Sequence, residues 1–182
     1  MSAEQDRKAP MASAPIKYRD DGQVDWGNMW DAFCVLAKDG GPPHRETVLV
    51  APSDPDSDSE GYRFATGEII RGIHEVSGLE AWPGAPGWVA VRCKSAGMAL
   101  WLEEAIALEN VQARSQGAVL LVPVGDNFSL KGEIKNVITA VAKTTHYWKE
   151  HMPADMKLAI TVESRVKGVQ KGLRRLLSRQ PV

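Results

Sequence analysis

The sequence predicts a single α/β (or α+β) domain, in which helices pack on a mixed sheet of about four strands. The chain has 182 residues, and 43% of them are hydrophobic, which is enough to bury the core of one domain. Segments with apolar residues at helical spacing alternate with short β-rich runs. Alternation of this kind usually produces a sheet with helices packed against it.

The two ends of the chain differ from this central part. Residues 1–15 are Ala, Ser, Pro and charged residues without periodicity, so they should form a disordered tail that cannot offset the entropy of ordering. We place the α/β domain at residues 16–153 and a basic amphipathic segment at residues 154–182. Residues 157–163 alternate like a strand but also fit a helical stripe, and both alternatives stay open.

The first predicted helix covers residues 26–38, and a short strand follows at residues 46–50. Asp25 is placed to cap the start of the helix, and the Gly and Pro residues at 40–43 should end it. The strand is inferred from a short β-rich run.

The second predicted helix follows an acidic, Ser-rich loop. Ser57 and Glu60 have the spacing of a capping box, and Gly78 follows the last residue of the helical stripe. The loop at residues 53–59 should face solvent because of its charge and polarity. Residues 81–87 are rich in Pro and Gly, which predicts a second loop.

A buried strand and a third helix come next. Residues 88–93 are almost continuously apolar, as expected for a central strand that is covered on both faces. Ser95 can cap the helix that follows. Glu109, near the end of that helix, is expected to face water.

A hairpin and a long helix complete the domain. The runs at residues 111–115 and 118–124 flank Gly117, which tolerates the positive φ that tight hairpins need. The helix is predicted from Ser129 to Glu150, and Pro153 should end it. The buried stripe of the helix should consist of Ile134, Val137, Ile138, Val141, Thr145 and Trp148.

Composition limits the classes of function. The chain has 22 Lys and Arg against 23 Asp and Glu, which argues against nucleic-acid binding by the whole surface. No apolar run approaches the ~20 residues that span a bilayer, and no secretory signal pattern is present, so we expect a cytoplasmic protein without a transmembrane segment.

The cysteines suggest no metal or disulfide site. Cys34 and Cys93 are far apart and belong to no Cys-x-x-Cys pair. Cys93 precedes a predicted helix, where a thiol can have a lowered pKa and act as a nucleophile. The alternative, which we favour, is a buried structural thiol.

The starts of two predicted helices are candidate anion sites. Lys94 and Ser95 begin one helix, and Lys131 lies in the first turn of the other. Free N–H groups at helix starts attract anions, and lysine adds positive charge. Neither start has a phosphate-loop or dinucleotide pattern, and ordinary capping is the alternative. The sequence identifies no cofactor.

A cluster of basic side chains is the second candidate site. If the long helix packs antiparallel to the predicted first strand, Lys143 and His146 approach His44 and Arg45. Two imidazoles could act as acid and base on an acidic ligand anchored by Lys143 and Arg45. His146 and His151 are five positions apart, which does not match the i,i+4 spacing of zinc-binding helices, so no metal is predicted.

The C-terminal segment is the third candidate. Its cationic residues could contact an anionic membrane, nucleic-acid phosphates or a partner's groove. In the alternative that we favour, the segment covers the domain's own apolar face. The cationic residues are Arg165, Lys167, Lys171, Arg174, Arg175 and Arg179.

The first functional hypothesis is a binding or accessory protein that acts through contacts with a protein partner or with a second copy of itself. The alternative is a small enzyme or cofactor-binding protein that acts on an acidic or phosphorylated small molecule through the cluster of His, Lys and Arg. Nucleic-acid binding ranks below both because of the neutral charge balance.

Overall fold

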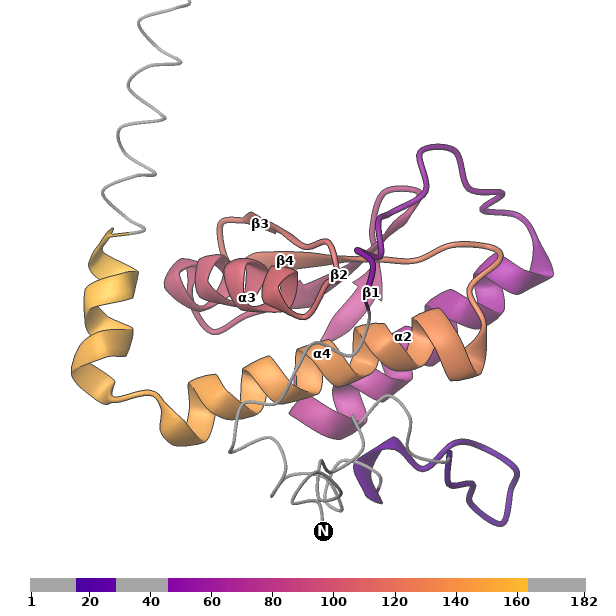
Figure 1. Cartoon of the computed structure of the whole chain (residues 1–182), viewed down its shortest axis with the longest axis horizontal. Coiled ribbons are helices and arrows are strands. Elements are labelled where there is room, and N and C mark those ends of the chain that lie inside the picture. Colours follow the sequence, from indigo (N-terminus) through magenta and orange to yellow (C-terminus); the bar gives the residue numbers. More distant parts are fainter. Residues whose placement is uncertain (1–15, 29–45, 164–182) are drawn as a thin grey trace, which may run out of the picture.

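The structure is a computed structural model that describes residues 16–28 and 46–163 (Figure 1). Two π-helical turns, η2 and η3, flank α4, so the chain is helical from residue 130 to residue 151. Residues 154–163 are also helical, which decides the open choice for residues 157–163 in favour of a helix. The elements are α2 (Glu60–Ser77), β1 (Ala81–Pro83), β2 (Trp88–Arg92), α3 (Ala96–Leu108), β3 (Arg114–Gln116), β4 (Val119–Pro123), η2 (Leu130–Ile134), α4 (Lys135–His146) and η3 (Tyr147–His151).

The four strands form one sheet in the order β1-β2-β4-β3, and each neighbouring pair runs antiparallel. This arrangement confirms an α/β domain with a four-stranded sheet and helices packed on it. The sequence predicted a sheet with both parallel and antiparallel strands. In the described part of the chain, the one parallel pairing is an isolated bridge between Leu49 and Val111. Short turns join β1 to β2 and β3 to β4, and turns of this kind require antiparallel neighbours.

The prediction of a strand at residues 46–50 is wrong. The first strand of the sheet is β1, which was not predicted. Leu49 is buried while its neighbours in this segment are exposed. Its N–H and C=O groups make 2.8 Å bonds to the backbone on either side of Val111, so the segment is attached to the domain through this residue. β1 lies within the predicted loop at 81–87. Pro83 is tolerated there because β1 is an edge strand, on which one side needs no backbone donor.

One face of the sheet forms the centre of the core. Val89 and Val91 of β2 pair with Val122 and Leu120 of β4, and all four side chains are fully buried. Residues from α2, α3 and α4 belong to the same buried cluster, so the helices cover this face. The prediction of a buried central strand at residues 88–93 is therefore confirmed.

The opposite face carries aromatic side chains beneath arginines. The guanidinium of Arg114 lies 4.5 Å from the ring centre of Trp88, and that of Arg92 lies 5.0 Å from the ring centre of Trp82. Contacts of this kind attract a cation to the electron-rich ring face. The arginines thus help to shield a sheet face that would otherwise expose apolar surface.

The predicted long helix is confirmed. Its first and last turns, η2 and η3, are π-helical and therefore wider than the turns of an α-helix. At its start, the N–H and hydroxyl of Ser129 both donate to the carboxylate of Glu133 at 2.9 Å. At its end, Met152 adopts an extended conformation before Pro153. All residues of the predicted stripe are buried, namely Ile134, Val137, Ile138, Val141, Thr145 and Trp148.

The structure also tests the predicted helix caps and the hairpin. α2 is capped by Ser59 rather than by Ser57, and it ends at Gly78, which has a φ of 67°. Ser95 caps α3 as predicted, because its hydroxyl accepts a bond from the first turn. Gly117 has a φ of 60° between β3 and β4, which confirms the hairpin.

The first predicted helix begins at Trp26, where the described segment shows helical residues. The carboxylate of Asp25 accepts a bond from the N–H of Asn28 at 3.1 Å, as expected of a cap. The rest of this helix, with its stop signal at residues 40–43, lies outside the described residues.

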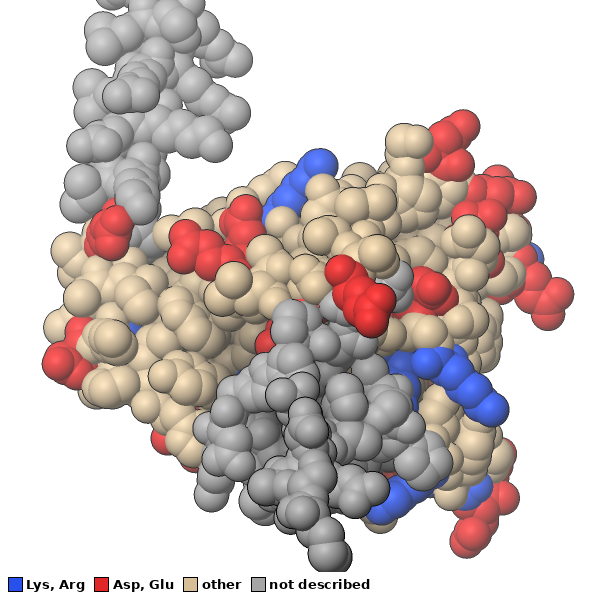
Figure 2. Space-filling model, in the orientation of Figure 1, with Lys and Arg blue, Asp and Glu red and all other residues tan. Residues whose placement is uncertain are grey.

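Acidic side chains gather where the loop at residues 53–59 leads into α2 (Figure 2). Among the residues that the structure describes, no helix combines the length and the apolar character needed to cross a membrane.

Candidate functional site

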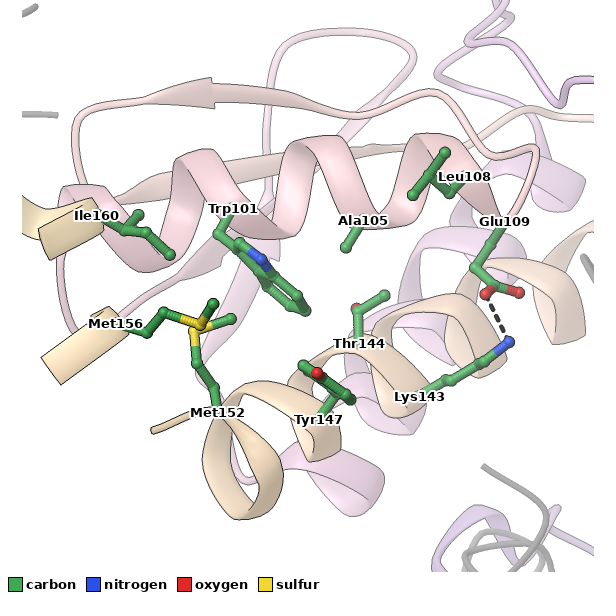
Figure 3. Close-up of a pocket in the computed structure, with 10 residues that line it drawn as sticks. All are labelled: Trp101, Ala105, Leu108, Glu109, Lys143, Thr144, Tyr147, Met152, Met156 and Ile160. Carbon is green, nitrogen blue, oxygen red and sulfur yellow. Dashed lines mark ion pairs between the residues drawn. The ribbon is translucent and has the colours of Figure 1, made fainter. Parts of the chain in front are cut away.

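A solvent-open cavity of about 400 Å³ lies where α3, α4 and η3 meet the helical residues 154–163, which we name the C-terminal helix (Figure 3). Small-ligand pockets typically have volumes of roughly 300–1,000 Å³. The cavity is lined mainly by apolar side chains, so it suits an apolar ligand. The lining residues are Trp101, Ala105, Leu108, Glu109, Lys143, Thr144, Tyr147, Met152, Met156 and Ile160.

The first wall of the cavity is one face of α3. Trp101, Ala105 and Glu109 follow one another at four-residue steps, and such steps place side chains on the same side of a helix. The Trp101 ring stacks on Tyr147, with centroids 5.7 Å apart and planes inclined by 12°. It also packs against Trp148 at a centroid distance of 5.6 Å. Figure 3 shows Trp101 and Tyr147 between Glu109 on one side of the cavity and Met156 and Ile160 on the other.

The C-terminal helix forms another wall. It packs closely on the start of α3, because a Cβ atom at Gly97 would lie 2.6 Å from the Cα of Thr161. The ammonium of Lys157 donates to the carbonyl of Lys149 at 3.1 Å, which ties the helix to η3. Met156 points from this helix into the cavity (Figure 3), and a flexible thioether side chain adapts easily to ligands of different shape.

An ion pair forms the polar end of the cavity. Lys143 Nζ lies 2.6 Å from Glu109 Oε1, and the two side chains are only 12% and 10% exposed. The expectation that Glu109 faces water is therefore wrong. Lys143 reaches this carboxylate from α4, and sequence spacing within α3 gives no sign of a partner on another helix. Charges held away from bulk water interact strongly, so this pair can orient a polar group of a ligand.

Apolar side chains surround the mouth of the cavity. Leu108 is 76% exposed, Met156 is 55% exposed and Tyr147 is 47% exposed. Single exposed apolar residues are common, but a cluster of them at a cavity is typical of a binding site. On the outer face of the C-terminal helix, Leu158 and Val162 are exposed as well.

No protein-family model matches the chain. No curated protein and no solved structure is significantly similar to it either. The geometry and chemistry of the cavity therefore carry the functional proposal.

The basic cluster predicted at the end of the long helix is partly described. Lys143 lines the cavity and pairs with Glu109. His146 follows one turn later, outside the cavity lining. His44 and Arg45 lie outside the described residues, so acid–base chemistry between His44 and His146 stays a prediction.

The predicted anion sites lie at two separate places. Ser95 accepts a bond from the N–H of Met98 at 3.0 Å, so ordinary capping accounts for this residue. Burial, followed by the charge of Lys94, lowers the pKa of Lys149, which places Lys94 near the η3 end of the long helix. Lys131 is exposed at the opposite end of that helix. Anion binding at these starts stays a prediction.

Cys93 has the properties of a structural thiol. Its side chain is buried in the core with 5% exposure. Burial raises the pKa of the Cys93 thiol to about 12, and a backbone hydrogen bond with Leu120 offsets this only in part. The thiolate is the nucleophilic form, so this environment favours the structural alternative over nucleophilic catalysis.

Lys143 is the one residue of the cavity lining that the sequence suggested as a ligand-binding residue. The helical stripe of α3 predicts Trp101 as an ordinary core residue and Glu109 as a surface charge. The residues that meet in the cavity come from α3, α4, η3 and the C-terminal helix, so only the packing of these elements brings them together. A second indication in the sequence was Met156, an apolar residue soon after Pro153, where the long helix ends.

Proposed function

We propose that the protein is a binding protein whose ligand is an amphipathic small molecule, held with its apolar part in the cavity. The observation that carries the proposal is the open apolar cavity with an ion pair at one end. Sites of this kind gain affinity from apolar burial and use a few polar groups to orient the ligand.

The two ends of the cavity suggest how the ligand is oriented. Away from the ion pair, Trp101 and Tyr147 together with Met156 and Ile160 offer apolar surface on which rings or chains can pack. Lys143 and Glu109 lie at the other end, where a polar head group can form hydrogen bonds with either side chain. The ligand's polar group therefore points along α3 toward Glu109.

The test uses the full chain and the amphipathic probe 1-anilinonaphthalene-8-sulfonate. Ala105 lines the cavity, whereas Ala107, two positions later on α3, is exposed and does not line it. The Ala105→Phe variant should fill the cavity and abolish the probe's fluorescence enhancement. The matched Ala107→Phe variant adds the same ring to the same helix and should leave it unchanged.

Equal binding by both variants would contradict the proposal, because it would place the probe elsewhere.

A second titration compares octanoate, octylamine and octanol, and follows the fluorescence of Trp101. A Trp101→Phe variant should lose the ligand-dependent signal, whereas a Trp82→Phe variant on β1 should retain it. A preference among the three head groups that Glu109→Gln alters would support contact with the ion pair.

A protein partner, including a second copy of the chain, is the second candidate. It is favoured by Leu158 and Val162, which are 65% and 52% exposed on the C-terminal helix. These residues belong to the stripe that was expected to cover the domain's own apolar face, so in the described residues this stripe remains available for contact. Light scattering should show a mass above that of the monomer, and a Leu158→Glu and Val162→Glu double variant should be monomeric.

A further inference from the structure

The end of the long helix brings two histidines together. The Nε2 atoms of His146 and His151 are 3.1 Å apart, and their ring planes are inclined by 63°. Residues five positions apart on an α-helix point about 140° away from each other, because each residue turns the helix by about 100°. The i,i+4 spacing of zinc-binding helices applies to α-helices, whereas residues 147–151 form a π-helical turn.

The π-helical turn η3 explains the approach of the rings. Its backbone bonds join residues five positions apart, as in the 3.0 Å bond from Met152 N–H to the carbonyl of Tyr147. This wider turn brings residues i and i+5 closer to the same side of the helix than an α-helix does. Rare π-helical turns are frequently found at functional sites, and here two imidazole nitrogens lie side by side.

The nitrogen separation fits a shared metal ion. Two nitrogen ligands at about 2.0–2.1 Å from a tetrahedral zinc ion stand about 3.3–3.4 Å apart. At neighbouring corners of a square-planar copper ion they stand about 2.9 Å apart. The observed 3.1 Å lies between these values. It also fits a hydrogen bond between neutral imidazoles, so the experiment must separate the two.

The neighbouring cations have other partners. The ammonium of Lys143 pairs with Glu109, and that of Lys149 donates to the carbonyl of Ser77. Both charges are thus bound by other oxygen atoms. The described residues contain no group of three or more His, Cys, Asp or Glu side chains that could hold a metal, so the histidine pair would supply two ligands.

We propose that His146 and His151 bind a divalent transition-metal ion through their Nε2 atoms, with water or another donor completing the coordination. Imidazole is a preferred ligand of Cu²⁺, Zn²⁺ and Ni²⁺. The site is independent of the proposed cavity ligand. The bound ion would link the last residue of α4 to the last residue of η3, and η3 also carries Tyr147 of the cavity wall.

The test uses full-length protein without a histidine tag. Isothermal titration with Cu²⁺ measures affinity, and electron paramagnetic resonance of bound Cu²⁺ reports coordinated nitrogen. His146→Ala and His151→Ala should each weaken Cu²⁺ binding by at least about tenfold, since losing even an outer-shell partner of a ligand typically costs 10–100-fold. Both variants should also lose nitrogen hyperfine structure.

The matched control is His74→Ala. His74 is an exposed histidine on α2, so its removal should leave Cu²⁺ affinity and the spectrum unchanged. His44 does not serve as a control because it lies outside the described residues. Wild-type affinity in either single variant would overturn the proposal, as would a wild-type spectrum without nitrogen coupling.

Stability gives a second measurement. An ion that binds only the folded protein raises its Tm, so Zn²⁺ should raise the Tm of the wild type and of His74→Ala but not of His151→Ala. If His146→Ala fails to fold, His151→Asn makes the same test at an exposed position. A pair joined by a hydrogen bond alone predicts no Zn²⁺-dependent shift in any of these proteins.

Discussion

At the residue scale, Cys93 shows how burial changes the chemistry of one side chain. Its pKa is raised from 9.0 to about 12 by burial. A thiol with a raised folded-state pKa contributes stability that is fully present below pH 9 and is lost as the pH rises toward 12. Between pH 8 and 10.5, the wild type should lose about 2 kcal/mol more free energy of unfolding than Cys93→Ala.

Denaturant titrations at both pH values measure this difference. Groups other than Cys93 titrate in both proteins, so the comparison isolates this thiol. Equal losses would show that Cys93 is not buried in the folded state. As an independent check, iodoacetamide at pH 8 should leave the Cys93 peptide unmodified until denaturant is added.

Glu109 is the residue for which sequence reasoning failed most clearly. Its buried pairing with Lys143 predicts that Glu109→Gln costs roughly 3 kcal/mol of unfolding free energy, because a buried lysine loses its anionic partner. The matched control is Glu80→Gln. Glu80 pairs with Arg92 at the surface, where the side chains are 68% and 61% exposed, so this change should cost less than about 1 kcal/mol.

Chemical denaturation of the two variants gives both values. Similar costs for the two substitutions would mean that the Glu109 pair is exposed to solvent. The sequence could not reveal this ion pair because the spacing of residues within α3 predicts a surface charge at Glu109. The partner, Lys143, lies on another helix, and only the packing of the two helices brings them together.

At the scale of the element, long periodic segments are predicted well. The helix from Ser129 to Glu150 is evident in the sequence because five apolar residues and Thr145 repeat at helical spacing, and a repeat of this length is typical of an amphipathic helix. Residues 46–50 were predicted as a strand and residues 81–83 as a loop, and both predictions are wrong. Segments of three to five residues are too short to show a clear periodicity of apolar residues. The π-helical turns η2 and η3 are missed because π-helices are rare and the predicted stripe assumes α-helical spacing.

Gly97 provides a test of how the C-terminal helix is attached. A Cβ atom at this position would lie 2.6 Å from the Cα and 2.9 Å from the N atom of Thr161. The contact is with backbone, so the C-terminal helix must move in Gly97→Ala, at a cost of about 1–3 kcal/mol. Binding of the fluorescent probe should weaken too, since this helix forms one wall of the cavity.

The matched change is Gly67→Ala. Gly67 lies on the exposed side of α2 with open space around it, so an added methyl group should stabilise the protein by about 0.5–1 kcal/mol. Thermal unfolding and probe titration distinguish the two variants. Unchanged probe binding in Gly97→Ala would show that the C-terminal helix does not form the cavity wall.

At the scale of the molecule, the sequence predicts one α/β domain but not how its beginning is held. Trp26 is 2% exposed, and its indole N–H donates to Glu68 on α2 at 2.8 Å. Arg71, also on α2, donates to the carbonyl of Val24 at 2.9 Å. The segment that begins at residue 16 is therefore bound to α2 by both apolar burial and hydrogen bonds to charged groups.

This attachment predicts where the domain begins. Trp26→Ala should lower the unfolding free energy by about 3–5 kcal/mol, because it leaves a cavity beside α2 and removes the indole donor from Glu68. Removal of residues 1–15 should change it by less than about 0.5 kcal/mol, since no apolar periodicity there supports a role in the core. Urea titrations followed by circular dichroism measure both. A large loss of unfolding free energy on truncation would move the domain boundary toward the N-terminus. A small loss for Trp26→Ala would mean that residues 16–28 pack on α2 without stabilising the domain.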